Sequence, residues 1–180
     1  MYDKIKYLKV LINNYIKSYE DFPVKGVSFK DISNLCNSAG FELANEFLYS
    51  CLIKYKTTKV IGIDARGFIF ASVYASKASL PLVLARKKGK LPGEVESKEY
   101  ELEYGLANIE IKKDNINKKD NIVIIDDLCA TGGTALATID IVNNLGGKVV
   151  AVGSIIDLPK LGGSDKIKER NIPFYNAVSY

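Results

Sequence analysis

Hydrophobic side chains in the first third of the chain recur at helical spacing. The pattern predicts two amphipathic helices, one over residues 3–18 and one over residues 39–54. Their inward faces carry Ile5, Leu8, Ile12 and Tyr15 in the first helix, and Ala44, Phe47, Leu48 and Cys51 in the second. Between them, Phe22-Pro23 begins an irregular segment that runs through Asp31-Ile32.

From residue 59 onward, short apolar runs alternate with helical patterns. The runs predict strands at residues 59–64, 81–85, 121–126 and 148–156, and the patterns predict helices at residues 67–78 and 133–145. Such alternation is typical of a mainly parallel sheet with helices on both faces. We therefore expect an α/β fold in which residues 1–180 form one domain.

Composition excludes several classes of protein. The 180 residues are 47% hydrophobic, but no apolar run is long enough to span a membrane and the first residues lack a signal-peptide core. Three cysteines without metal-type spacing indicate a reduced, cytoplasmic protein. A net charge of +4 is too mild to predict nucleic-acid binding by itself.

The choice of cationic and nucleophilic residues narrows the chemistry. The chain has no histidine, which excludes a Ser-His triad and removes the commonest general base. Of its 25 cationic residues only Arg66, Arg86 and Arg170 are arginine. A planar guanidinium binds phosphate or diphosphate in a bidentate manner, so the arginines that follow predicted strands suggest an anion site.

The most informative segment runs from Asn121 to Thr134. Its apolar run predicts a buried parallel strand that ends at Asp126 and Asp127, and a loop of small residues then leads into a helix. Free N–H groups at a helix N-terminus bind phosphate, and carboxylates accept hydrogen bonds from sugar hydroxyls. The segment therefore predicts a site for a sugar phosphate.

Three other interpretations of this segment are weaker. A Walker loop requires a lysine after its last glycine, but Thr134 follows Gly133. A dinucleotide fingerprint requires three spaced glycines, and only the pair Gly132-Gly133 is present. An ordinary strand–turn–helix junction would leave the two acids unexplained.

The segment resembles the 5-phosphoribosyl-1-diphosphate (PRPP) signature of the type I phosphoribosyltransferases. The resemblance implies that family's fold, with a small N-terminal hood at residues 1–35 and a flexible lid loop at residues 87–108. It also implies that Asp126 and Asp127 hold the ribose hydroxyls. The 5′-phosphate would be held by the loop residues Ala130, Thr131, Gly132, Gly133 and Thr134.

Three further segments, at residues 22–32, 63–70 and 86–105, resemble the adenine-specific members of that family. The first implies that Phe29 and Leu128 sandwich adenine while backbone groups of Ser28 and Lys30 read its edge. The second and third imply a diphosphate site. Its residues would be Asp64, Ala65, Arg66, Arg86 and Lys90, with a cis peptide bond between Asp64 and Ala65.

The lid range is longer and more polar than a crossover requires. Stretches of this length without regular structure inside a compact domain are often active-site lids. The resemblance places Tyr104 in the lid and implies that Glu103, with Arg66, acts in catalysis as the lid closes over the reacting centre. It further implies a homodimer and a Mg²⁺ ion held by the substrate and water.

This chain departs from the resemblance at Lys25, where proline is usual, and at Cys129, where an aliphatic residue is common. We expect Cys129 to be a small packing residue; the alternative is a thiol that is reachable in the empty site. Two alternatives for the activity also stay open. One is transfer to xanthine, hypoxanthine, guanine or orotate, and the other is a non-catalytic PRPP-sensing regulator, although we expect too few residues before the core for an added DNA-binding domain.

Overall fold

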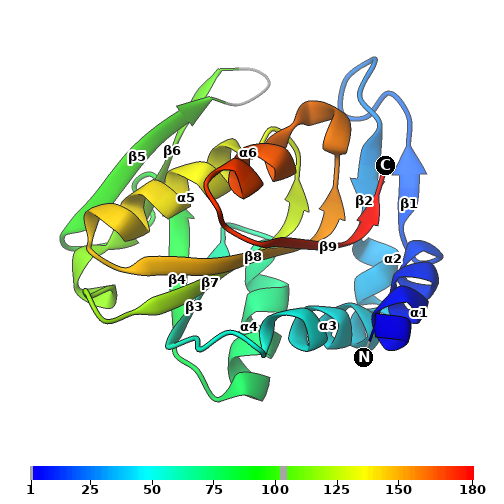
Figure 1. Ribbon diagram of the computed structural model, residues 1–180. Helices are drawn as coiled ribbons and strands as arrows, with labels where there is room; N and C mark the ends of the chain where they lie inside the picture. Colours follow the sequence, from blue (N-terminus) through cyan, green and yellow to red (C-terminus); the bar gives the residue numbers. More distant parts are fainter. Residues whose placement is uncertain (1, 102–104) are drawn as a thin grey trace.

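The computed structural model describes residues 2–101 and 105–180. Seven strands form one sheet in the order β5-β6-β4-β3-β7-β8-β9 (Figure 1). Their bounds are β3 (Lys59–Ile63), β4 (Leu82–Lys87), β5 (Val95–Glu101), β6 (Leu106–Lys112), β7 (Asn121–Cys129), β8 (Lys148–Asp157) and β9 (Phe174–Ser179). Strands β4, β3, β7, β8 and β9 are parallel, whereas β5 and β6 run antiparallel at one edge. The predicted mainly parallel α/β sheet is confirmed.

Helices cover both faces of this sheet (Figure 1). They are α1 (Tyr2–Asn13), α2 (Ser33–Cys36), α3 (Gly40–Leu52), α4 (Gly67–Ala78), α5 (Gly133–Asn144) and α6 (Gly163–Glu169), with 3-10 turns at Lys113–Asn115 and Pro159–Leu161. Helices α1, α3 and α4 pack on one face, and α5 and α6 pack on the other. Among residues 2–101 and 105–180, none of the helices combines the length and apolar character that crossing a bilayer requires.

The core is divided by the sheet into two apolar layers. Alternate residues of β7 face opposite layers, so Val123 and Ile125 pack with α3 and α4, while Ile122 and Ile124 pack with α5. All four side chains are fully buried. This burial on both faces explains why the strand reads as a continuous run of β-branched residues.

The N-terminal region differs from the sequence-based prediction in two respects: the first helix is shorter, and residues 29–31 form a strand in the segment that was expected to be irregular. The first helix ends at Asn13 rather than at residue 18, because β1 (Lys17–Tyr19) pairs antiparallel with β2 (Phe29–Asp31). This two-stranded sheet is separate from the large sheet and forms the hood beside the carboxyl end of β9 (Figure 1). Its pairing places Tyr19 opposite Phe29.

The expectation of an irregular excursion after residue 87 is wrong for residues 95–101 and 106–108, which form strands, whereas residues 88–94 have no helix or strand. Strands β5 and β6 form a long antiparallel hairpin, with Val95 opposite Lys112 and Glu101 opposite Leu106. Ile109 and Ile111 of β6 are fully buried, whereas most of β5 is exposed. Charged residues on an edge strand concealed the strand pattern, since such a strand buries little and needs no apolar run. Whether the hairpin moves as a lid stays a prediction.

Strand order fixes where a ligand can bind. The chain passes from β3 to β4 on one side, and then returns to place β7 on the other side of β3. In open α/β sheets, the crevice at such a reversal of strand order lies between loops that leave in opposite directions. Here the loop after β3, which carries Asp64 to Arg66, flanks it on one side. The last residues of β7, from Asp126 onward, and the loop that joins them to α5 flank it on the other; the strand thus continues to Cys129, past the acids at which the sequence predicted its end.

Candidate active site

The loop between β7 and α5 offers main-chain hydrogen-bond donors. The N–H groups of Thr131, Gly132, Gly133 and Thr134 donate no hydrogen bond to any residue that the structure describes. Gly132 has φ +81°, a left-handed conformation that glycine adopts without a steric penalty and that turns the chain into α5. Four free donors at a helix N-terminus form a site for a phosphate group.

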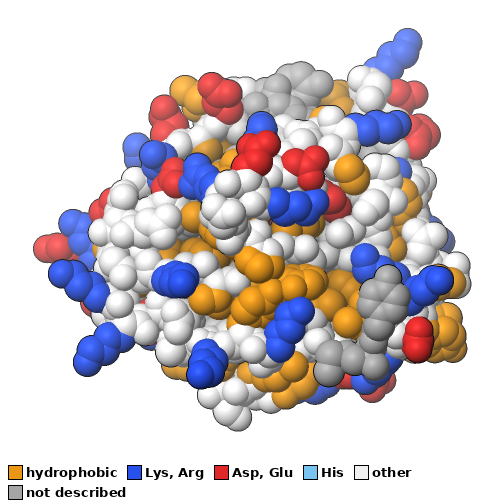
Figure 2. All heavy atoms as spheres, viewed as in Figure 1, with side chains coloured by type: hydrophobic (Ala, Val, Ile, Leu, Met, Phe, Trp, Pro, Cys, Tyr) orange, Lys and Arg blue, Asp and Glu red, His pale blue; other side chains and the backbone are white. Residues whose placement is uncertain are grey.

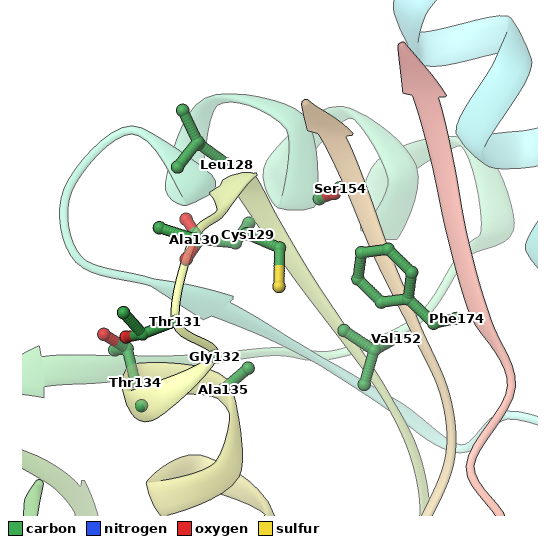
Figure 3. Close-up of a pocket in the computed structure, with 12 residues that line it drawn as sticks. Leu128, Cys129, Ala130, Thr131, Gly132, Thr134, Ala135, Val152, Ser154 and Phe174 are labelled. Carbon is green, nitrogen blue, oxygen red and sulfur yellow. The ribbon is translucent and has the colours of Figure 1, made fainter. Parts of the chain in front are cut away.

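A cavity of about 360 Å³ borders this loop (Figure 3). One wall is apolar and contains Cys129, Val152 and Phe174. The side chains of Thr131 and Thr134 lie on the opposite side of the loop from this wall in Figure 3. An anion is therefore favoured on the side of the threonines and free N–H groups, because the apolar wall offers it no donor.

The two acids at the end of β7 are adjacent and poorly solvated. Asp126 accepts a hydrogen bond from the main-chain N–H of Asp127 at 2.8 Å, and Asp127 is only 6% exposed. Burial, followed by the neighbouring charge of Asp127, raises the pKa of Asp126 well above its usual range. Burial also raises the pKa of Asp127, although the Arg66 guanidinium opposes that shift. Buried carboxylates of this kind gain by accepting hydrogen bonds from a ligand's hydroxyls.

Arg66 joins three parts of the site. Its Nε lies 2.9 Å from Oδ2 of Asp127, and its guanidinium carbon lies 5.6 Å from the centre of the Phe29 ring. The peptide bond between Asp64 and Ala65, just before it, is cis, as the resemblance implied. The side chain reaches from the loop after β3 to both the acid pair and the hood, so the crevice is bridged by one cation.

Arg86, near the end of β4, pairs with Asp64 in the loop after β3. Its Nε donates to Oδ2 of Asp64 at 3.1 Å, and the N–H of Lys87 also points to that oxygen at 3.4 Å. Lys90 follows in the turn after β4 and is exposed. The predicted diphosphate residues thus lie along the ends of β3 and β4, which are neighbours in the sheet. Glu103 and Tyr104, the predicted lid residues, lie outside the described residues.

The hood forms a cavity of about 430 Å³ whose walls include three aromatic side chains. Phe29 and Phe22 meet edge to face, with ring centres 5.1 Å apart, and Tyr19 and Arg66 complete the wall around them. Asp31 and Ser33 also line the cavity. An aromatic face beside a planar guanidinium is suited to a flat heterocycle.

The residues predicted to bind adenine are divided between cavities in this structure. Phe29 lines the hood cavity, whereas Leu128 lines the cavity beside the phosphate loop. The side chains of Ser28 and Lys30 line a third cavity, because alternate residues of a strand face opposite sides. Lys30 donates to Ser28 Oγ at 3.0 Å, and Ser28 donates to Glu20 at 2.7 Å. Only the main chain of Ser28 and Lys30 can therefore face a base on the side of Phe29.

Sequence reasoning gave no role to Tyr19, and it included Phe22 and Gly67 in segments of the resemblance without assigning them roles of their own. A Cβ added at Gly67 would lie 2.8 Å from Oδ1 of Asp126, so only glycine lets α4 begin against the acid pair. The position of Gly67 directly after Arg66 was a usable signal for this close approach. Tyr19 and Phe22 carried no comparable signal, because a turn brings them to Phe29 only in the folded hood.

Cys129 is a packing residue in this structure. It is 6% exposed in the apolar cluster beneath α5, and burial raises the pKa of its thiol to about 12. Iodoacetamide at pH 8 should therefore label half-buried Cys36 first and label Cys129 and Cys51 slowly, as measured by mass spectrometry. Adding AMP should not change the Cys129 rate. Rapid labelling of Cys129 that AMP suppresses would instead indicate a thiol exposed in the site.

Basic residues outside the site are dispersed. On the face seen in Figure 2, Lys and Arg side chains lie scattered rather than in one continuous stripe. Two of the three arginines, Arg66 and Arg86, lie at the crevice. The third, Arg170, pairs with Asp140 on α5. The local concentration of guanidinium groups thus coincides with the free N–H groups and the acid pair.

Comparison with known proteins agrees with this geometry. Residues 31–176 match the family described as phosphoribosyl transferase domain. The chain is 42% identical to adenine phosphoribosyltransferase of Actinobacillus succinogenes, over 94% of this chain and 95% of that protein. The crystal structure of the enzyme from Thermoanaerobacter pseudethanolicus superposes with a TM-score of 0.90 at 36% identity, covering 96% of this chain and 99% of that one.

The structure of the Giardia lamblia enzyme complexed with 9-deazaadenine also has a TM-score of 0.90, at 30% identity over 96% of this chain and 97% of that one. The fold and the family implied by the signature at residues 121–134 are thereby confirmed. The chain belongs to the phosphoribosyl transferase family, and within it to the adenine phosphoribosyltransferases.

Proposed function

We propose that this chain transfers the 5-phosphoribosyl group from PRPP to N9 of adenine, forming AMP and diphosphate. The observation that carries the proposal is the meeting of four free N–H groups, at Thr131 to Thr134, with the carboxylate pair of Asp126 and Asp127. The first group suits a phosphate and the second suits vicinal hydroxyls, so together they fit ribose 5-phosphate. Membership of the family supports the same reaction.

Substrate binding would exchange the partners of the two arginines. In the structure Arg66 pairs with Asp127, and Arg86 pairs with Asp64. Ribose hydroxyls would donate hydrogen bonds to the carboxylates of Asp126 and Asp127. The diphosphate would then pair with both guanidinium groups and with Lys90. Arg66 and Arg86 would then stabilise negative charge on the diphosphate as its bond to C1 of ribose breaks, N9 bonds to C1 and the base gives up one proton.

Adenine would lie against Phe29 in the hood, with Leu128 approaching from the side of the phosphate loop. The main chain of Ser28 and Lys30 would read the base edge, since both side chains point to the opposite face of β2. The Giardia lamblia relative, which was crystallised with 9-deazaadenine, supports an adenine-like base. Glu103 is proposed as the carboxylate that approaches the base when the hairpin carrying Tyr104 closes.

A magnesium ion fits this arrangement only with ligands from the substrate. Within the described part of the chain, no cluster of three or more His, Cys, Asp and Glu side chains could hold a metal ion by itself. Mg²⁺ prefers oxygen ligands and retains water, so PRPP would supply most of its ligands beside Asp126 and Asp127. When bound, it supplies positive charge that neutralises the leaving diphosphate. A cytoplasmic homodimer stays a prediction from the family resemblance.

An acceptor assay tests the proposal directly. With PRPP and Mg²⁺, we expect adenine to be converted to its nucleotide with a far higher kcat/KM than hypoxanthine, guanine, xanthine or orotate, because the base edge is read by fixed main-chain groups. Chromatography of the products gives the rates. Comparable rates with hypoxanthine would overturn the choice of base, and PRPP binding without turnover of any base would favour a regulator.

A further inference from the structure

The phosphate loop lies directly against a second turn, which joins β8 to α6. The N–H of Gly163 donates to the carbonyl oxygen of Ala130 at 3.1 Å, and the N–H of Leu158 donates to that of Cys129 at 2.9 Å. Figure 1 shows α6 beginning beside the loop that leads from β7 into α5. Two successive carbonyl groups of the phosphate loop are therefore held by residues 158–163.

The main chains of the two turns pack so closely that a side chain has no room between them. A Cβ added at Gly163 would lie 2.3 Å from the oxygen of Ala130 and 2.4 Å from the nitrogen of Gly132. From the other side, a Cβ added at Gly132 would lie 2.8 Å from Cα of Gly163. All of these neighbours are backbone atoms, which cannot move aside as a flexible side chain can. Glycine is required on both sides of the contact.

This contact fixes the direction of a donor in the phosphate site. The carbonyl and N–H of one trans peptide point in opposite directions. Because Gly163 holds the carbonyl of Ala130, the N–H of Thr131 in the same peptide points away from α6. That N–H is one of the four without a protein acceptor among residues 2–101 and 105–180.

We infer that Gly163 is a positioning residue for the 5′-phosphate, acting through the main chain of Ala130 to Gly132 without touching the ligand. This role rests on the proposed function, because it assumes that the loop binds a nucleotide phosphate. It would make residues 158–163 a support for the loop, and any side chain at position 163 would push the loop's donors out of alignment.

The adjacent glycine provides a matched control. Gly162 also has a left-handed conformation, with φ +74°, but a Cβ added there would meet no atom within 4 Å. Gly162→Ala should strain the turn and lower Tm by roughly 2–4 °C without touching the loop. Gly163→Ala adds the same methyl group one residue later, where it collides with the loop. The pair separates loss of stability from loss of alignment.

The test compares AMP with adenosine, which lacks only the phosphate. Calorimetry should show AMP binding to Gly163→Ala weakened about tenfold or more, because charge-assisted hydrogen bonds to the phosphate are lost. Adenosine binding should change by less than about twofold, and Gly162→Ala should bind both ligands as the wild type does. Equal AMP affinity in Gly163→Ala and the wild type would overturn the inference, and so would equal weakening by both variants.

A measurement on the unaltered protein covers the case in which Gly163→Ala does not fold. AMP should slow amide hydrogen exchange at Gly163, since ligand that orders the loop also holds the Gly163–Ala130 hydrogen bond closed. Unchanged exchange at Gly163, with protection confined to the loop, would overturn the inference. Failure of the proposed function is recognised separately: the wild type would then not form AMP from adenine and PRPP, while the AMP and adenosine titrations would still report on the loop.

Discussion

Replacing Arg66 by lysine is expected to lower kcat/KM for PRPP by about 10²- to 10³-fold, with most of the loss in kcat. Lysine keeps the positive charge but lacks the planar fork that reaches both Asp127, at 2.9 Å, and the face of Phe29, at 5.6 Å. Charge on the leaving diphosphate is greatest in the transition state, so a misplaced cation costs rate more than binding. Steady-state kinetics with varied PRPP gives both parameters.

The third arginine of the chain is the control for this substitution. Arg170 directly follows the last residue of α6 and pairs with Asp140 of α5. Arg170→Lys should leave kcat and KM unchanged, because the Arg170 side chain lines neither the cavity beside the phosphate loop nor the hood cavity. If Arg66→Lys retains kcat/KM within about threefold of the wild type, Arg66 is a structural partner of Asp127 rather than a diphosphate ligand.

The sequence predicted the elements that are most buried. Strand β7 was recognisable from its β-branched run because both faces are covered, and the two acids in its last part stood out as polar residues after an apolar run. The same reasoning applies to β3 and α4, where Arg66 and Gly67 mark the junction. At these positions local composition and tertiary environment favour the same structure, so a local pattern suffices.

Elements whose stability depends on distant pairing were harder to predict. Strand β5 exposes most of its side chains and exists because β6 pairs with it, so its sequence reads as polar loop. Strand β9 was missed because Phe174–Ser179 lies at the sheet edge beside β8 and buries only two of its residues, so it contains no continuous apolar run. Pairing energy of this kind is contributed by the partner strand and leaves little trace in the sequence of the strand itself.

The site shows the same division between local and tertiary information. Motif spacing identified the phosphate loop and the acids, but the division of Phe29 and Leu128 between two cavities depends on how the hood is placed. The support from Gly163 depends on a contact between two turns that only the fold brings together. The glycine pair at residues 162–163 predicts a turn, but the sequence does not indicate that this turn contacts the phosphate loop.

The acid pair gives the second large effect, because each carboxylate is proposed to accept a ribose hydroxyl. Asp126→Asn and Asp127→Asn should each weaken AMP binding by about 10- to 100-fold, from the loss of roughly 1.5–3 kcal/mol for a hydrogen bond to a charged group. The fold should persist, since an asparagine oxygen at position 126 can still accept the N–H of Asp127. Isothermal calorimetry gives the affinities.

Stability should change in the opposite direction to affinity for Asp126→Asn. Burial and the charge of Asp127 raise the folded-state pKa of Asp126, so the wild type is most stable when this group is protonated and loses stability as pH rises through that pKa. Asparagine carries no charge, and the variant should therefore have a Tm at pH 8 equal to or above that of the wild type. Asp127→Asn should gain less, because it also loses the ion pair with Arg66.

Asp157 is the matched control for both substitutions. It ends β8 beside Cys129, it is 4% exposed, and burial raises its pKa as it does for the acid pair, but it lies outside the proposed ribose site. Asp157→Asn should leave AMP affinity unchanged while altering Tm. If all three variants bind AMP as tightly as the wild type, the carboxylates at the end of β7 do not hold the ribose. If Asp157→Asn weakens binding as much as the other two, the loss reflects general disturbance of the sheet end rather than missing hydrogen bonds to a sugar.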